Sequence, residues 1–332
     1  MDRIRERQPA GTPIGGRFAP RSGDAPDIEL EPAHAPDEPT TLTYSQIERR
    51  SIEQARRQRR FLASELREQF FVGRLIDRVF TEPPIDDVHW ILKGGLRQLA
   101  ASRLARHTSD GDLYADIPLD EAITSLAACG QRDVGDGITY TIASIERYDD
   151  HPHAADITLA VHMHGRQVTT VNVDVSTKIR MAGTPRQLKP VNPLDLDLDQ
   201  PAGYRTYHPA DQIADKVAAT FELTPRGPSQ RYRDLVDIEL ISMSDGMTAD
   251  VLRRSLELEF TARNIPMPSR FTVPDHGAWS NGYEQIVSNI EGLRSRRYAD
   301  GFAAVAAFLD PVLDGSADGQ RWDRRSGRWV DG

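Results

Sequence analysis

The stretch HWILKGGLRQLAASRLARHTSDGDLYADI, residues 89–117, decides how the rest of the sequence is interpreted. It holds a double glycine, Gly94 and Gly95, and two aspartates at i, i+2 spacing, Asp110 and Asp112. In a β-strand, residues i and i+2 point to the same face, roughly 6.5 to 7 Å apart. Two carboxylates at that distance repel each other unless a cation lies between them. Mg²⁺ fits this need, because it takes carboxylate oxygens, keeps open positions and bridges substrate phosphates.

The double glycine permits a tight backbone turn at the start of a helix, and such a turn exposes N–H groups that can hold a phosphate. A strand, this turn, a helix and a strand bearing Asp-x-Asp therefore form a layout for seating the metal-bound triphosphate of a nucleotide. A third carboxylate on a neighbouring strand would complete a two-metal site. The segment VNVDVS offers Asp174, which is flanked by apolar residues of opposite strand parity.

Length and composition limit the alternatives. The chain has 332 residues, 39% of them hydrophobic, which is enough for two compact lobes. No window of about 18 residues is apolar and uncharged, and the first residues have no apolar signal-peptide core, so the sequence predicts a cytoplasmic protein without a membrane span. The single Cys129 agrees with a reducing compartment. A net charge of −9 argues against a general nucleic-acid coat but is compatible with local basic patches.

The N-terminal part of the sequence is polar. Residues 1–42 are rich in Pro, Gly, Ala and charged residues and have no apolar period, which predicts a disordered leader. Residues 43–82 are rich in arginine at first and then show helical periodicity, so we expect an arginine-rich helical segment. Those arginines form either a solvated helix face or a contact surface for the phosphate backbone of an RNA substrate.

The remaining sequence divides into two lobes and a tail. Residues 83–207 alternate strands and a helix, as an α/β or α+β domain should. Strands are predicted over 88–92, 110–116, 138–148, 156–164 and 167–176, the last three as a meander, with a helix over 96–105 and a loop over 192–203. Residues 208–315 form a helical lobe, with helical periodicity over 210–223, 229–242, 248–264, 282–293 and 298–313. Residues 316–332 lack an apolar period, which predicts a loose tail.

Two motifs resemble those of the AbiEii/AbiGii nucleotidyltransferase toxin family. In that family a Lys-Gly-Gly turn precedes Arg-x-Thr-x-Asp-x-Asp, and the matching residues here are Lys93, Gly94, Gly95, Arg106, Thr108, Asp110 and Asp112. Residues 208–241 are similar to the family's lysine-bearing helix and the Arg-x-Arg-Asp motif that follows it, and the matching residues are Lys216, Arg233, Asp234 and Asp237. The resemblance spans roughly residues 85–313, and two motifs in the family's order are much more specific than either alone.

This resemblance implies a polymerase-β-like nucleotidyltransferase core with a mixed sheet, followed by a helical C-terminal lobe. It implies an enzyme that transfers a nucleotide from an NTP to an acceptor and acts as the toxin of a toxin-antitoxin or phage-defence (abortive infection) system. A cognate antitoxin is then the expected protein partner. Some family members add nucleotides to the 3′ end of tRNA, so RNA is the expected acceptor and a protein is the alternative.

The resemblance also implies roles for single residues. The expected catalytic residues are Asp110, Asp112, Lys216 and Asp234. The expected nucleotide-binding residues are Lys93, Gly94, Gly95, Arg106, Thr108 and Lys216. Mg²⁺ (or Mn²⁺) would be held by Asp110 and Asp112 together with Asp174, which is assigned on strand parity and fold analogy.

Three positions depart from the family pattern. Gly111 separates the two aspartates where the family prefers a β-branched residue, Leu96 replaces a Thr or Ser after the turn, and Asp215 replaces a Glu before the lysine. Glycine weakens a strand, so a catalytically inert nucleotide-binding or protein-interaction module on the same fold is the alternative function. The retained charged residues favour the enzyme, because a decayed site should lose charges that cost stability when unpaired.

Overall fold

The structure is a computed structural model that describes residues 42–86, 88–149, 151–178, 180–222, 229, 231–288, 290 and 292–332. The disordered leader expected over residues 1–42 lies outside the described residues, apart from Leu42. Every described element belongs to one compact unit, Thr41–Gly332. None of the described helices combines the length and the apolar character that crossing a membrane requires.

The strands of the first lobe form one mixed sheet. They are β1 (Ile91–Lys93), β2 (Asp110–Tyr114), β3 (Ile138–Tyr148), β4 (His151–Met163), β5 (Arg166–Ser176), β6 (Arg186–Leu188) and β7 (Tyr204–Thr206). Within the described residues the order is β3-β4-β5-β2-β1-β7-β6. The strands β3, β4 and β5 form the expected antiparallel meander, whereas β2 pairs parallel with β5 and antiparallel with β1. The mixed sheet confirms the predicted α+β class.

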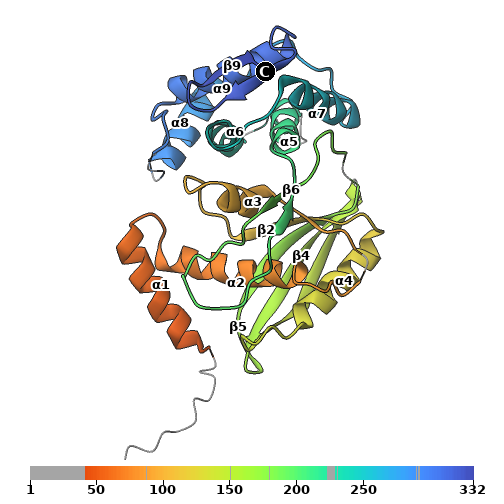
Figure 1. Cartoon of the computed structure of the whole chain (residues 1–332), viewed down its shortest axis with the longest axis vertical. Helices are drawn as coiled ribbons and strands as arrows, with labels where there is room; N and C mark the ends of the chain where they lie inside the picture. The colour runs from red at the N-terminus through yellow and green to blue at the C-terminus, as the bar shows by residue number, and fades with distance from the viewer. Residues whose placement is uncertain are drawn as a thin grey trace, which may run out of the picture. The chain divides into compact units, whose positions relative to one another are not determined.

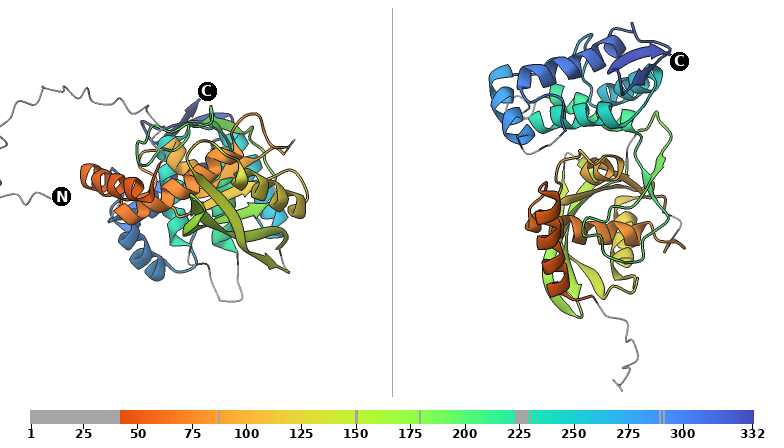
Figure 2. Two further views of the ribbon diagram at one scale, coloured as in Figure 1. Left: turned by 90° about the horizontal axis from the view of Figure 1, so that it is seen from below. Right: turned by 60° about the vertical axis from the view of Figure 1, so that its left-hand side comes forward.

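The helices fall into two groups, shown in Figure 1. The first group is α1 (Tyr44–Gln58), α2 (Ala63–Val79), α3 (Gly94–Ala101) and α4 (Leu119–Gln131), of which α2 and α4 pack on one face of the sheet. The second group gathers into a lobe of its own, as the right-hand view of Figure 2 shows. It contains α5 (Pro209–Phe221), α6 (Tyr232–Ser244), α7 (Ala249–Ala262), α8 (His276–Val287) and α9 (Tyr298–Leu313).

Two hydrophobic clusters underlie these groups. The first joins α1, α2, α4 and the sheet, and its last residue is Tyr204; the second joins the C-terminal helices and begins at Ala210. The expected border between the two lobes, residue 207, lies between these positions. The arginine-rich segment 43–82 is therefore not a separate unit, because the apolar side chains of α1 and α2 belong to the first cluster.

One face of the sheet is covered and the other carries charge. In β5, Val173 and Val175 are buried, whereas Asp174 between them is exposed. On the open face, Glu146, Asp156 and Asp174 lie in register across β3, β4 and β5, and Asp112 of β2 continues the row. The first three of these side chains are exposed. Alternation along each strand thus places the carboxylates opposite the side on which α2 packs.

Gly111 belongs to the covered face. A Cβ atom at this position would lie 3.3 Å from Val72 Cγ2 and 3.4 Å from Ile76 Cδ1, both on α2. The missing side chain therefore lets α2 approach β2 closely. A β-branched residue at this position would collide with α2. The glycine therefore agrees with the packing of α2 against β2 in this chain.

Several local expectations differ from the structure. The N-terminal helical segment is two helices, because Arg59 ends α1 in the left-handed region with a φ of 52°. The helix expected over 96–105 stops at Ala101. No element was predicted where α4, β6 and β7 lie: α4 is rich in small residues that weaken its apolar period, and the two strands have three residues each.

The prediction of a loose tail over residues 316–332 is wrong. Residues 320–331 form a hairpin of β8 (Gln320–Asp323) and β9 (Arg328–Asp331). The ring of Trp322 is buried and lies 4.7 Å from that of Phe308 on α9, against which Trp329 stacks at 5.4 Å. Two tryptophans anchor this hairpin, which is too few apolar residues for a sequence period to appear.

Candidate active site

The two motif aspartates lie on β2, side by side with other charged residues. Asp112 is opposite Lys93 of β1 on one side and opposite Asp174 of β5 on the other. Asp110 lies two residues earlier in β2, opposite Asn172. Because paired residues of neighbouring strands point to the same face, the register brings Lys93, Asp112 and Asp174 into one row.

The double glycine forms the turn that was expected. Gly94 follows β1 directly and starts α3, with a φ of 61°. A Cβ atom on Gly94 would lie 1.7 Å from Asp112 Oδ2, and one on Gly95 would lie 2.6 Å from Thr108 Oγ1. The turn thus needs glycine both for its left-handed backbone and for the close approach of Asp112 and Thr108.

Lys216 and Arg106 are held by carboxylates of α6. Lys216 Nζ donates to Asp234 Oδ1 at 2.7 Å and to Asp237 Oδ2 at 2.9 Å. Arg106 donates to both carboxylate oxygens of Asp237, at 2.9 and 3.0 Å. Burial lowers the pKa of Lys216, but the charges of Asp237 and Asp234 outweigh burial and leave it raised. Lys216 therefore stays positively charged although it is buried.

Further contacts join the helical lobe to the turn. Gln212 of α5 donates from Nε2 to the carbonyl of Gly94 at 3.0 Å. Arg97 of α3, fully buried, donates to both oxygens of Asp245 at 3.0 and 2.9 Å. The first contact positions α5, which carries Lys216, beside the turn, and the second fixes the end of α6 to α3.

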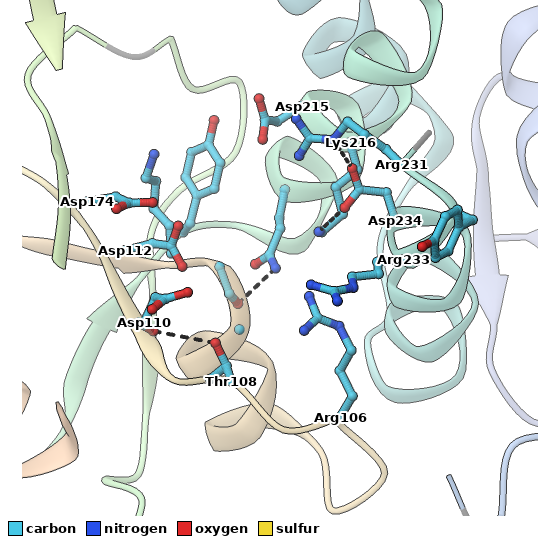
Figure 3. Close-up of a pocket in the computed structure, with 16 residues that line it drawn as sticks. Arg106, Thr108, Asp110, Asp112, Asp174, Asp215, Lys216, Arg231, Arg233 and Asp234 are labelled. Atoms are coloured by element: carbon cyan, nitrogen blue, oxygen red, sulfur yellow. Dashed lines mark hydrogen bonds and ion pairs between the residues drawn. The ribbon is translucent and has the colours of Figure 1, made fainter. Parts of the chain in front are cut away.

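A pocket of about 460 Å³ lies where these elements meet. Its lining includes every residue proposed from sequence: Lys93, Gly94, Gly95, Arg106, Thr108, Asp110, Asp112, Asp174, Lys216 and Asp234. Figure 3 shows Asp110, Asp112 and Asp174 on one side and the cationic side chains of Arg106, Lys216 and Arg233 on the other. The pocket thus has an acidic wall from the sheet and a basic wall from the helical lobe and the loop before β2.

The structure adds pocket residues that the sequence analysis did not assign to a site. They are Tyr207, Gln212, Asp215, Arg231, Tyr232 and Arg233. Gln212 is buried, and its Oε1 has no hydrogen-bond partner among the described residues. Its position four residues before Lys216 was a usable signal, because i and i+4 share a helix face. For the two tyrosines no sequence signal was available.

The acidic wall suits a divalent cation that arrives with phosphates. The pocket walls desolvate the carboxylate of Asp174, although much of its side chain is exposed, and this desolvation, followed by the charges of Asp112, Asp156 and Asp110, raises its pKa to about 7. Burial likewise raises the pKa of Asp112, and the charge of Asp110 adds to this effect. A bound cation relieves such repulsion, and carboxylate oxygens are ligands that Mg²⁺ prefers. Among the described residues no three His, Cys, Asp or Glu side chains are placed to hold a metal ion by themselves. These carboxylates therefore fit Mg²⁺ that substrate phosphates also coordinate, rather than a closed protein cage.

A glycine turn that starts a helix, carboxylates on the adjacent strand and a facing lysine are the parts of a nucleotidyltransferase site. The chain belongs to the family described as the nucleotidyl transferase AbiEii toxin of type IV toxin-antitoxin systems, whose model matches residues 78–322. This match confirms the resemblance that the motifs indicated. The protein is accordingly a nucleotidyltransferase toxin, and membership of this family implies an NTP substrate and an antitoxin partner.

Solved structures are similar to this chain at low sequence identity. One is MenT4, a nucleotidyltransferase toxin from Mycobacterium tuberculosis, with a TM-score of 0.49 and 16% identity, covering 86% of this chain and 99% of that chain. Another is JHP933 from Helicobacter pylori, with a TM-score of 0.44 and 14% identity, covering 76% of this chain and 95% of that chain. No curated protein matches the sequence.

Proposed function

We propose that the protein transfers a nucleotide from an NTP to the 3′ end of an RNA, with tRNA as the acceptor. The reaction takes place in the cytoplasm, where the toxin is restrained by a cognate antitoxin and serves a toxin-antitoxin or phage-defence (abortive infection) system. One observation carries the proposal: carboxylates and cations face each other across a pocket that also contains the glycine turn.

The basic wall and the turn bind the nucleotide. The triphosphate is held by the backbone N–H groups of the turn and by Lys93, Gly94, Gly95, Arg106, Thr108 and Lys216. Lys216 and Arg106 already stand at fixed positions, because Asp237 pairs with both of them. Fixed cations stabilise the charge of a reacting phosphate without having to reorganise during the reaction.

The acidic wall holds the metal. Asp110, Asp112 and Asp174 would hold Mg²⁺ (or Mn²⁺), and the bound ion would supply positive charge against the phosphates. Asp234 keeps Lys216 in place from the opposite side. The oxygen of the acceptor hydroxyl forms a bond to the α-phosphorus, the bond between the α-phosphorus and the leaving pyrophosphate breaks, and the hydroxyl proton passes to solvent water. Catalysis of this kind depends mainly on positioning and electrostatics, so each metal-binding carboxylate is essential.

The test is direct. Purified protein is incubated with each α-labelled NTP, Mg²⁺ and total tRNA, beside the isosteric variant Asp112→Asn, and with EDTA in a parallel reaction. We expect label on RNA from the preferred NTP, a rate at least about 10²-fold lower for the variant, and no transfer with EDTA. Expression in cells should arrest growth, and Asp110→Ala should relieve the arrest.

Other outcomes identify other functions. Label on a polypeptide would move the acceptor from RNA to protein. NTP binding without transfer to any acceptor would favour the inert nucleotide-binding module. Equal toxicity of the wild type and Asp110→Ala would separate the toxic effect from nucleotidyl transfer.

A further inference from the structure

A second and larger cavity, of about 930 Å³, adjoins the active-site pocket. Its lining comes from the turn between α1 and α2, the loop before β2, and the end of α8. Four residues line both cavities: Arg106, Thr108, Asp110 and Arg233. The two spaces therefore meet at Asp110. We call the second space the arginine cleft, because its lining includes Arg56, Arg59, Arg60, Arg106 and Arg233.

The charge of the arginine cleft is opposite to that of the chain. Its carboxylates are Glu65 and Asp110, against five arginines. Glu65 is already used at the start of α2, where it accepts the Leu62 N–H at 2.7 Å. Within the described part of the chain, Arg56, Arg59 and Arg233 are exposed and have no ion pair. In a protein of net charge −9, unpaired cations gathered in one concave surface indicate an anionic ligand.

The backbone at Arg59 supports a role for its side chain. Arg59 ends α1 with φ 52° and ψ 24°, a left-handed conformation that glycine adopts most easily at this place in a helix. An arginine here bears a backbone cost that glycine would avoid. Within the described residues the exposed guanidinium makes no hydrogen bond or ion pair that would offset this cost. The conformation thus points to a use of the side chain outside the folding of the chain.

Flat and apolar groups line the cleft beside the charges. The guanidinium of Arg60 lies 4.4 Å from the centre of the Phe61 ring and donates to the carbonyl of Ala105. His107 contacts the edge of the same ring, at 6.2 Å between centroids. Leu62 is 67% exposed, although it is a large hydrophobic residue. Sites for single-stranded nucleic acid combine cations for the backbone with flat side chains for the bases.

We propose that the arginine cleft binds the single-stranded end of the RNA acceptor and delivers its terminal hydroxyl to Asp110. This inference rests on the proposed function. A nucleotide bound at the glycine turn and Lys216 fills the pocket from one side, and the arginine cleft reaches the same carboxylate from the other. The family match begins at residue 78, so it does not cover the α1–α2 turn, which supplies Arg56, Arg59 and Arg60 to the arginine cleft.

The test removes cations that the fold does not need. Arg56→Ala combined with Arg59→Gly takes two charges from the cleft, and the glycine relieves the left-handed backbone, so the melting temperature should hold or rise. The Michaelis constant for the RNA should rise roughly tenfold, and the salt dependence of RNA binding should lose about two units of slope. The Michaelis constant for the NTP and kcat should stay at the wild-type values. RNA affinity is measured by fluorescence anisotropy with a 5′-labelled oligonucleotide that has a free 3′ end.

Arg254→Ala is the matched control. Arg254 is also an exposed helical arginine without an ion pair in the described part of the chain, but it lines neither cavity. It should leave RNA affinity unchanged. If the double variant transfers nucleotides with the wild-type Michaelis constant for RNA, the arginine cleft is not the acceptor site and the proposed function still stands. If the wild type transfers nothing to RNA, the proposed function fails first.

Discussion

Gly94 and Asp112 cannot be changed independently, because the carboxylate occupies the space of a side chain at Gly94. Gly94→Ala would combine a left-handed alanine with a displaced carboxylate. We expect it to lower the free energy of unfolding by about 2 kcal/mol or more and to abolish measurable NTP binding. Urea denaturation and calorimetric titration with the NTP measure the two effects.

Gly135→Ala separates these two causes. Gly135 has a φ of 75°, and a Cβ there would meet no atom within 4 Å. This variant bears the backbone cost, about 1 kcal/mol, without a clash. NTP affinity should equal that of the wild type. A loss of NTP affinity as large as that of Gly94→Ala would show that the contact with Asp112 is not the reason.

Asp112→Asn should separate stability from activity. The amide has the size of the carboxylate but removes a charge that is half-buried and lies beside Asp110. Without Mg²⁺, we expect the free energy of unfolding of the variant to equal the wild-type value or to exceed it by up to about 1 kcal/mol. The rate of nucleotide transfer should fall at least about 10²-fold. Urea denaturation and the transfer assay test this. A variant destabilised by several kcal/mol would mean that the carboxylate serves the fold.

At the level of single elements, α5 carries Lys216 and begins with a titratable cap. His208 Nδ1 accepts the Ala210 N–H at 3.2 Å. Burial, with the charges of Arg186 and Arg97, lowers the pKa of His208 to about 4, against a small opposing effect of Asp245. The pKa of His208 in the folded protein lies below its ordinary value of 6.5. The contribution of neutral His208 to the free energy of unfolding is therefore complete above pH 6.5 and is lost as the pH falls towards 4.

We expect His208→Asn to remove this part of the acid sensitivity. Asparagine keeps an N-cap acceptor but does not titrate. Between pH 7 and pH 4 the wild type should lose about 2 to 3 kcal/mol more stability than the variant. Urea denaturation at several pH values measures the difference. Parallel pH profiles for the two proteins would mean that His208 is not the group responsible.

Long helices and strands with a regular apolar pattern could be predicted from the sequence. Very short strands, and strands that are held by a few aromatic contacts, could not. The meander β3–β4–β5 was predicted because alternation over about ten residues is a strong signal. The strand β6 has three residues, too few for a periodic pattern, and joins the edge of the sheet by pairing with β7. The hairpin at the C-terminus depends on Trp322 and Trp329 packing on Phe308, a contact that no local period reports.

In the whole molecule, a buried ion pair ties the sheet lobe to the helical lobe. Arg97 is fully buried and bonds Asp245 through both carboxylate oxygens. Asp245→Ala would leave the guanidinium buried without its partner. We expect a loss of about 3 to 5 kcal/mol in the free energy of unfolding, and weaker NTP binding because the end of α6, which packs against α5, is no longer fixed to α3.

A double-mutant cycle tests this coupling. Arg97→Met combined with Asp245→Ala removes both charges, so it should be more stable than Asp245→Ala alone. Urea denaturation of the four proteins gives the coupling energy. Strictly additive losses would show that the pair does not connect the lobes energetically.

The pocket could be predicted only in part, because contacts between residues far apart in the sequence build it. The motifs specify residues that follow one another closely, such as Asp110 and Asp112. They do not specify contacts across the chain, such as Arg106 with Asp237, 131 residues apart. Gln212 and Arg233 reach the pocket because α5 and α6 pack beside the turn. Tertiary packing, rather than local pattern, decides which polar side chains meet there.

The row of Glu146, Asp156 and Asp174 gives the molecule a side that repels polyanions. An RNA that diffuses towards the open face of the sheet meets three exposed carboxylates in register, whereas one that approaches the α1–α2 turn meets unpaired guanidinium groups. Within a Debye length, about 8 Å at physiological salt, this asymmetry orients an approaching polyanion before any contact forms. If the acceptor is RNA, as proposed, this charge distribution favours its approach along the α1–α2 turn and disfavours its approach to the open face of the sheet.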